Sequence, residues 1–215
     1  MLEEKNNNEE LQESEELLET ELDEELQNDE NIENVIYDWA RCLVSAVVAV
    51  VLLFTFCFRM ISVSGGSMQN TLYTNDHLIM LNSEFCNYEQ GDIVVVNAYN
   101  AMLDETIIKR IIAVGGQTVD IDFNAGIVYV DGVALDEPYA KEPTYTAEGT
   151  VFPLTLAEDE IFIMGDNRNR STDSRSVMLG PVKVDYVQGE AVFLLLPGKS
   201  ADTGKMDFSR IGFIK

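Results

Sequence analysis

Residues 106–114 read TIIKRIIAV, a run of β-branched side chains with two cations at its centre. Such a run is typical of a β-strand. Alternation along a strand places Ile107, Lys109 and Ile111 on one face and Arg110 on the other. If the first face is buried, desolvation lowers the pKa of the lysine and favours a neutral amine. If the strand lies at a sheet edge, the lysine instead reaches water and blocks aggregation.

Similar short runs occupy much of the chain on both sides of this strand. Turn residues separate them, and Asp131-Gly132 marks a tight hairpin after one of them. The runs cover residues 78–81, 93–97, 118–122, 126–130, 161–164 and 191–196. The pattern predicts a mainly β fold, with mostly antiparallel strands, from residue 62 to residue 215.

A run of seventeen uncharged residues, 42–58, precedes the strands and lies between Arg41 and Arg59. Its length is close to the ~20 residues that cross a bilayer, and Trp39 stands where an interfacial aromatic residue is common. The alternatives are a helix buried in a soluble core and a cleaved secretory signal. The run is apolar all round, and it follows a long acidic stretch rather than the basic start of a cleaved signal. We therefore predict a single transmembrane anchor over residues 39–61.

The net charge of −24 is concentrated near the N-terminus. Residues 1–38 hold 16 acidic side chains and one lysine, whereas residues 62–215 hold 22 acidic and 11 basic side chains. Nucleic acid would repel both segments, so no nucleic-acid partner is expected. Leucines recur in the tail at near-helical spacing. This fits a disordered or partly helical solvated tail, or an amphipathic helix with an unknown partner.

Three cysteines and one histidine lack the spacing of a zinc site, and no nucleotide-binding glycine loop is present. Cys42 and Cys57 lie fifteen residues apart on the expected helix and cannot bridge each other. The sequence therefore predicts no metal, no cofactor and no intramolecular disulfide.

A candidate nucleophile follows the apolar run. Residues 64–72 read SGGSMQNTL, in which Ser67 follows Gly65 and Gly66. Glycines would let a substrate strand approach closely and let a backbone N–H face a developing oxyanion. An ordinary glycine turn is the alternative. A serine hydroxyl needs a neighbouring base to become a nucleophile, and a desolvated lysine can be that base without a histidine.

Residues 165–175 read GDNRNRSTDSR and contain three arginines, two aspartates and three hydroxyl side chains. No apolar side chain interrupts them. Such a composition is typical of a plain surface loop. The alternative is a network of charge-assisted hydrogen bonds that holds one hydroxyl in place.

These segments occur in a characteristic order: the apolar run, SGGSMQNTL, GDIVVV, IIKRIIAVGG, GDNRNRSTDSR and LGPV. The series, over residues 42–188, resembles the bacterial type I signal peptidases, a family of membrane-bound Ser-Lys endopeptidases. The resemblance implies an antiparallel β catalytic core with a smaller inserted β lobe at about residues 117–158. It also implies a cytoplasmic tail, residues 1–38, and an extracytoplasmic catalytic domain, residues 62–215.

The same resemblance assigns roles to individual residues. Ser67 is expected to be the nucleophile, Lys109 its general base, and Ser171 the hydroxyl that orients the lysine amine. The backbone N–H of Ser67 is expected to stabilise the oxyanion. The supporting ion pairs are expected to be Asp166 with Arg110 and Asp173 with Arg175.

The resemblance also implies a reaction and its partners. The enzyme would cleave exported preproteins after a small residue in an A-x-A-like signal sequence, while a single-pass anchor holds it in the lipid bilayer. Two departures from the family pattern bear on this expectation. Asn70 replaces a usual proline, and Gly115-Gly116-Gln117 replaces Pro-Gly-Asp.

Two rival readings remain. The loss of the proline favours an inactive relative that binds signal sequences without cutting them. A Ser-Lys self-cleaving protease of the kind attached to repressors is the other reading. Such proteases carry a DNA-binding module, and this chain has an acidic tail and an apolar run in its place.

Overall fold

The computed structural model describes residues 34–98, 105–200 and 203–214. The chain divides into two compact units, Met1–Leu53 and Phe54–Lys215. Most of the predicted acidic tail lies outside the described residues.

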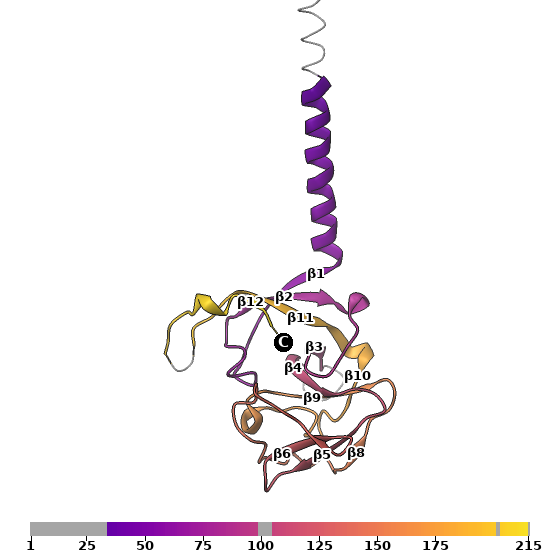
Figure 1. The fold of residues 1–215 in the computed structure, drawn as a ribbon, viewed down its shortest axis with the longest axis vertical. Helices are drawn as coiled ribbons and strands as arrows, with labels where there is room; N and C mark the ends of the chain where they lie inside the picture. Colours follow the sequence, from indigo (N-terminus) through magenta and orange to yellow (C-terminus); the bar gives the residue numbers. More distant parts are fainter. Residues whose placement is uncertain (1–33, 99–104, 201–202, 215) are drawn as a thin grey trace, which may run out of the picture. The chain divides into compact units, whose positions relative to one another are not determined.

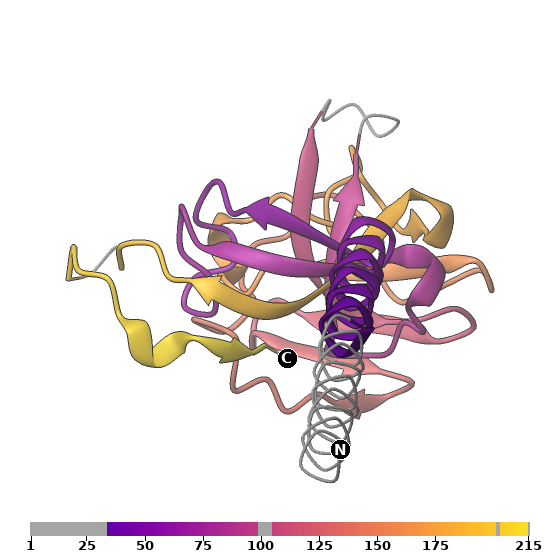
Figure 2. The ribbon, with the colours of Figure 1, turned by 90° about the horizontal axis from the view of Figure 1, so that it is seen from above.

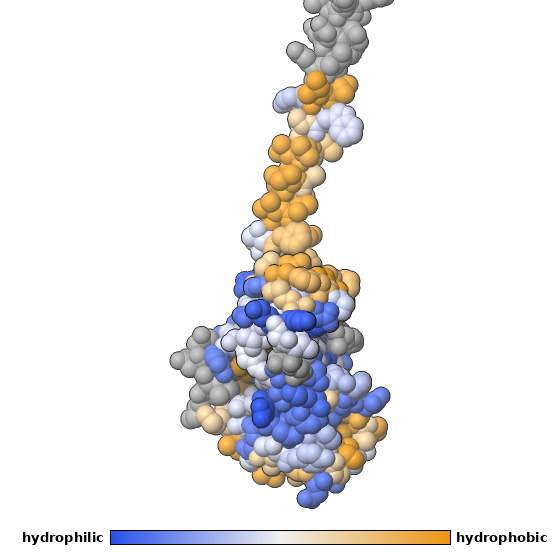
Figure 3. Space-filling view, turned by 90° about the vertical axis from the view of Figure 1, so that its left-hand side faces the viewer, coloured by the Kyte–Doolittle hydropathy of each residue, from blue (hydrophilic) through white to orange (hydrophobic). Residues whose placement is uncertain are grey.

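An apolar helix spans the stretch Asn34–Phe56. None of that stretch is buried, and Figure 3 shows apolar side chains along the helix. Its 23 residues are enough to cross a bilayer. The helix begins and ends earlier than the predicted range 39–61. The predicted end is wrong because residues 58–61 pair with a neighbouring strand and leave the helix.

The second unit is built mainly on an eight-stranded antiparallel sheet (Figure 1). Its order is β1-β2-β11-β3-β4-β9-β10, and β12 pairs with β11. The strands are β1 Phe58–Ser62, β2 His77–Asn82, β3 Ile93–Asn97, β4 Thr106–Ala113, β9 Glu160–Met164, β10 Val182–Lys183, β11 Val187–Leu196 and β12 Gly212–Phe213. Four short 3₁₀ helices are described between strands: Ser83–Phe85, Arg168–Arg170, Val184–Tyr186 and Phe208–Arg210.

A smaller sheet, of order β7-β6-β5-β8, lies between β4 and β9 in the chain. Its strands are β5 Thr118–Asp122, β6 Ile127–Val130, β7 Val133–Ala134 and β8 Leu154–Thr155. They fall inside the range 117–158 expected for an inserted lobe. Ile112, Phe162 and Met164 of the large sheet pack in one core with Val119 and Leu156. The two sheets therefore share a hydrophobic interior and stabilise each other.

The long strands overlap their predicted ranges, although β11 begins at Val187 rather than at residue 191, and the prediction of a mostly antiparallel β fold is confirmed. The hairpin at Asp131-Gly132 is also present. Both residues have positive φ, 53° and 77°, as a tight two-residue turn requires.

Strand β4 lies between β3 and β9 in the interior of the large sheet. Lys109 in β4 is only 4% exposed, and Arg110 beside it is 1% exposed. An edge strand with a solvated lysine is therefore the wrong reading. The sequence places a basic side chain in the core, where its chemistry differs from that in water.

Candidate active site

The candidate nucleophile lies in the loop of residues 63–76, which joins β1 to β2. Two backbone hydrogen bonds close the loop at its base, from Val63 N to Asp76 O (2.9 Å) and from Asn75 N to Val63 O (2.8 Å). Met68 and Leu72 are buried in the core beneath it. These anchors leave Ser67 half-buried at the wall of a groove of about 580 Å³.

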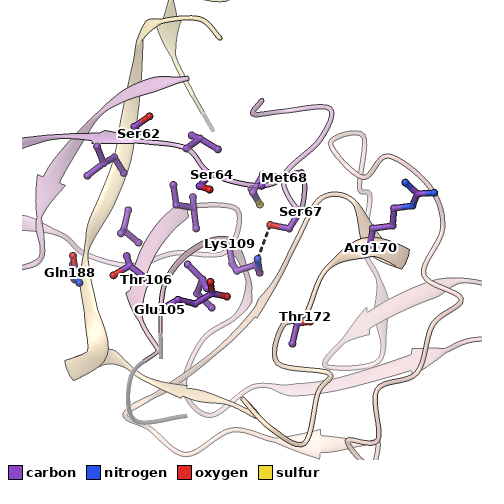
Figure 4. A pocket seen from close by; sticks show the side chains of 17 residues that line it. Ser62, Ser64, Ser67, Met68, Glu105, Thr106, Lys109, Arg170, Thr172 and Gln188 are labelled. Atoms are coloured by element: carbon purple, nitrogen blue, oxygen red, sulfur yellow. Dashed lines mark hydrogen bonds between the residues drawn. The ribbon is translucent and has the colours of Figure 1, made fainter. Parts of the chain in front are cut away.

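Lys109 meets Ser67 in this groove, and the two side chains point toward each other in Figure 4. Lys109 Nζ lies 2.8 Å from Ser67 Oγ and is hydrogen-bonded to it. The backbone of Lys109 is fixed within strand β4, which pairs with β3 at Val94. The structure thus brings together two predicted site residues that are 42 positions apart in the chain.

Burial lowers the pKa of Lys109 from its ordinary value. Desolvation is the main cause, because an ammonium ion loses its hydration in the core. The carboxylates of Asp173, Glu105 and Glu148 oppose the shift, while Arg175 adds to it. The net effect favours the neutral amine, which can accept a proton.

The segment of residues 165–175 is largely buried, so the surface-loop reading is wrong. Asp166, Asp173 and Arg175 are each 0% exposed. Charged side chains tolerate such burial when they are paired and hydrogen-bonded.

The first of these pairs joins Arg110 to Asp166. Arg110 donates from Nε to Oδ1 (2.9 Å) and from Nη2 to Oδ2 (2.8 Å), which is a bidentate contact. Its third nitrogen, Nη1, donates to Gly91 O at 2.7 Å, and Tyr139 stacks on the guanidinium at 4.1 Å. Burial raises the pKa of Tyr139 to about 12, so its hydroxyl stays neutral at ordinary pH.

The second pair joins Arg175 to Asp173, with two contacts of 2.8 Å from Nε and Nη2. Arg175 also donates to the carbonyl oxygens of Arg168 (2.6 Å) and Thr146 (3.1 Å). Asp173 in turn accepts from Gly165 N at 3.0 Å. Both predicted ion pairs are therefore formed, and the second one ties the two ends of the 165–175 segment together.

This segment also binds the loop of residues 63–76 directly. That loop carries the candidate nucleophile and is called the nucleophile loop below. Asn167 donates from its backbone N to Ser67 O and from Nδ2 to Gly66 O, both at 2.9 Å. Sequence reasoning missed Asn167 as a site residue, although it belongs to the GDNR motif. Its signal was its place in the motif, but only the fold brings it to Ser67.

Gly165 is the point of closest approach between the two segments. A Cβ on Gly165 would lie 2.5 Å from Ser67 O and 2.6 Å from Ser171 Cβ, and closer still to Ser171 Oγ. No real side chain fits there, so glycine is required for Ser67 and Ser171 to approach each other.

Ser171 is buried, and its Oγ has no hydrogen-bond partner among the described residues. The hydrogen bond expected between Ser171 and Lys109 is therefore absent from this structure. Lys109 Nζ contacts Ser67 Oγ instead. The orienting role of Ser171 stays a prediction.

Gly115-Gly116-Gln117, one of the two departures from the family pattern, fits its place in this structure. Gly115 cannot carry a side chain, since a Cβ would meet Glu158 O, and Gln117 Oε1 accepts from Val114 N at 3.0 Å. This side chain closes the turn between β4 and β5. Among the described residues, no cluster of His, Cys, Asp and Glu side chains is arranged to hold a metal ion.

The chain is similar to known proteins over most of its length. The family model described as signal peptidase, peptidase S26, matches residues 36–196. Signal peptidase I of Bacillus amyloliquefaciens is 33% identical over 174 residues, covering 77% of this chain and 90% of the relative. Signal peptidase I S of Bacillus subtilis (strain 168) is 32% identical over 172 residues, covering 75% and 90%.

A crystal structure of a signal peptidase I from Enterococcus faecalis V583 also matches. It is 30% identical, covers 49% of this chain and 97% of that chain, and has a TM-score of 0.40. The family model spans most of the chain, and the Bacillus relatives match over nearly their whole length. This chain therefore belongs to the S26 family of signal peptidases.

Proposed function

We propose that this protein is a membrane-anchored serine endopeptidase that removes signal peptides, with Ser67 as nucleophile and Lys109 as general base. The observation that carries the proposal is the 2.8 Å contact between a half-buried hydroxyl and a 4% exposed lysine amine. Membership of the S26 family supplies the reaction class, the removal of signal peptides.

The proposed chemistry needs no metal or cofactor. The neutral Lys109 amine takes the proton of Ser67 as Oγ attacks the carbonyl carbon of the scissile bond. The resulting ammonium then returns a proton to the leaving amine, and an ester links the substrate to Ser67. A water molecule activated by the same amine hydrolyses this ester. A lowered pKa suits Lys109 for both proton transfers.

The orientation of the Gly66–Ser67 peptide supports the proposed oxyanion donor. Gly66 O is held by Asn167 Nδ2 at 2.9 Å and by Gln69 N at 3.3 Å. Because N–H and C=O point in opposite directions in a trans peptide, the Ser67 N–H faces away from these donors. It is thus free to receive the developing negative charge. Gly65, with φ of 90°, leaves this approach open on the side facing solvent, since a Cβ there would meet nothing within 4 Å.

Part of the groove wall is apolar. Aliphatic side chains line it near the dyad, and several are β-branched. They are Ile61, Val63, Met68, Val95, Ile107 and Ile108. An apolar lining suits an apolar residue such as alanine, and we propose cleavage after a small residue of an A-x-A-like sequence, as the family resemblance implies.

The apolar helix Asn34–Phe56 supports anchoring of the enzyme in a lipid bilayer. Substrates with an apolar signal segment enter the same membrane, which raises the effective concentration of each partner for the other. We further propose that the tail, residues 1–38, is cytoplasmic and that the β domain, residues 62–215 with an inserted lobe at about 117–158, is extracytoplasmic.

One rival function is an inert module that binds signal sequences. The Asn70 change motivated it, but the dyad contact and both buried ion pairs are intact in the chain that carries Asn70. A structure with assembled machinery favours an active peptidase over this rival.

The test uses the purified full-length protein in detergent with a precursor that carries an A-x-A site. We expect one shortened product from the wild type and from a Lys183→Ala control, whose lysine is surface-exposed. Ser67→Ala and Lys109→Ala should give none. Product from Ser67→Ala would refute the nucleophile, and binding of precursor without cleavage by the wild type would favour the inert module. Cleavage of the chain itself without cleavage of precursor would favour a self-cleaving protease.

A further inference from the structure

The C-terminal segment, described over residues 197–200 and 203–214, follows the region 36–196 that the family model matches. Strand β12 pairs with β11 at Phe193 and Leu194, beside the rest of the large sheet (Figure 2). Ile214 packs against the buried cluster that contains Met68 and Leu72 of the nucleophile loop. This segment therefore touches the underside of the loop that carries Ser67.

Its most extensive polar contact is between Arg210 and Asp76. Arg210 donates from Nη2 to Asp76 Oδ2 at 2.6 Å and from Nη1 to Oδ1 at 3.1 Å. The aspartate side chain is 0% exposed and the arginine side chain 18% exposed. Asp76 also accepts from Gly198 N at 2.6 Å, so a second part of the same segment reaches the same carboxylate.

Arg210 reaches further into the nucleophile loop than its partner carboxylate. Its Nη2 donates to Thr71 O at 2.9 Å, and its guanidinium stacks 4.4 Å from the ring centre of Tyr73. Asp76 Oδ2, which accepts from Arg210 Nη2, also accepts from Tyr73 N at 2.8 Å. One arginine thus binds three loop residues, Thr71, Tyr73 and Asp76, and a planar guanidinium is suited to such a multiple contact.

Thr71 is held from the opposite direction as well. Its Oγ1 donates to Asp166 Oδ2, the carboxylate that pairs with Arg110 beside Lys109. The loop therefore lies between two buried or half-buried ion pairs, one next to the base and one from the C-terminal segment. Asn70, which immediately precedes Thr71, leaves the loop without a proline ring to stiffen it, so these contacts carry the ordering of the backbone.

We propose that Arg210 is a positioning residue for the reaction, which fixes residues 67–76 so that Ser67 stays within reach of Lys109. Arg210 is absent from the walls of the substrate groove. Its effect is therefore transmitted through the loop to the nucleophile. This inference rests on the proposed Ser67–Lys109 chemistry.

The first test measures kcat and KM for precursor cleavage by the full-length protein. We expect Arg210→Gln to lower kcat by roughly 100-fold, the size of effect that an ångström-scale misplacement of reacting groups produces, with KM changed by less than about twofold. Arg210→Lys keeps the positive charge but loses the planar guanidinium, so its kcat should lie between those of the wild type and Arg210→Gln. Lys205→Gln, an exposed cation of the same segment, is the matched control and should keep wild-type values.

Chemical rescue separates a positioning role from a loss of folding. Added guanidinium ion at low millimolar concentration should restore part of the kcat of Arg210→Ala, whereas the same concentration of sodium chloride should not. The 18% exposure of the arginine side chain leaves the site open to a small cation. Wild-type kcat in both Arg210→Gln and Arg210→Lys would overturn the proposal, and so would an equal loss in Lys205→Gln.

Amide hydrogen exchange tests the same proposal without any cleavage. The amides of Leu72 and Asp76 are bonded within the loop to Met68 O (2.7 Å) and Tyr73 O (3.0 Å). Their exchange should be at least about tenfold faster in Arg210→Gln than in the wild type or in Lys205→Gln. If the wild type cleaves nothing, the proposed function fails. The exchange measurement still decides whether Arg210 orders the loop. Unchanged exchange in Arg210→Gln would overturn the proposed ordering of the loop by Arg210, even in an active enzyme.

Discussion

Lys109 Nζ lies 2.8 Å from Ser67 Oγ, and the two residues reach each other from different parts of the large sheet. Ser67 is carried by the loop between β1 and β2, whereas Lys109 is carried by β4. In the sheet, β11 and β3 lie between β2, where this loop ends, and β4. The contact depends on the loop folding back over the sheet, where Met68 and Leu72 bury their side chains.

The pH dependence of cleavage should report on Lys109. Its pKa is lowered by desolvation, and the proposed reaction uses the neutral amine, so kcat/KM should fall as the pH drops through the lowered pKa. Glu105 opposes the shift by favouring the ammonium. Glu105→Gln should therefore move the acidic limb to lower pH in a pH–rate profile. Glu84→Gln removes an exposed carboxylate from another part of the surface and should leave the limb in place. A limb that does not respond to Glu105→Gln contradicts the assignment.

Replacing Lys109, the proposed base, should make the protein inactive but more stable. The folded protein favours a neutral Lys109, whereas the unfolded chain holds its proton up to the ordinary pKa of 10.5. Between the lowered pKa and 10.5 the unfolded state binds the additional proton, so stability is lost as the pH falls through that interval. Below pH 10.5 the desolvation of Lys109 therefore costs folding free energy.

Lys109→Met removes this cost and keeps a similar volume. We expect its thermal midpoint at neutral pH to rise by about 3 °C for each kcal/mol recovered, and its stability to depend less on pH than that of the wild type. Calorimetry or thermal circular dichroism at several pH values measures both effects. A lower midpoint at every pH would show that the amine is stabilised by its surroundings rather than desolvated.

Gly165→Ala should disrupt the site from within. The added methyl would lie 2.5 Å from Ser67 O, so the nucleophile loop and the 165–175 segment would have to separate. We expect a loss of kcat of at least about 100-fold, because the hydroxyl would move relative to the amine. Gly132→Ala is a useful comparison, since it strains a positive-φ turn by about 1 kcal/mol but meets no atom within 4 Å. It should lower stability and keep activity.

Breaking the Arg110–Asp166 pair should be far more damaging than breaking a surface pair. Asp166→Asn leaves a buried guanidinium without its countercharge, which typically costs about 3–5 kcal/mol of unfolding free energy. Asp159→Asn removes a partner of Lys183 at 3.1 Å, but both side chains are exposed and no measurable change is expected. Urea denaturation of the two variants makes the comparison. Equal stability of both would show that the 165–175 segment is not held by this pair.

The long strands could be predicted because their signal is local. In β4, β5 and β11 the pattern depends only on β-branched or alternating apolar residues within one run. The short strands β1, β10 and β12 have no such pattern, since their conformation depends on pairing with residues far away in the chain. The end of the apolar helix was misplaced for the same reason.

The candidate site was predictable only as a set of residue types. The composition of residues 165–175 is that of an exposed loop, yet Asp166 and Arg175 are completely buried. Composition cannot report this, because burial depends on whether each charge finds its counterion, and Arg110 lies 56 positions from Asp166. Asn167, Thr71 and Arg210 escaped notice for the same reason, as their partners are also distant in the chain.

The amino-acid sequence by itself determined the apolar helix, the series of antiparallel strands and a serine and a lysine able to share a proton. Those features follow from hydrophobicity, alternation and side-chain chemistry, which are properties of neighbouring residues. Only the tertiary structure decided that Lys109 is desolvated, that it lies beside Ser67 and that Arg210 binds the nucleophile loop. A pKa and a contact distance depend on groups that the chain brings together only by folding, so no single segment encodes them.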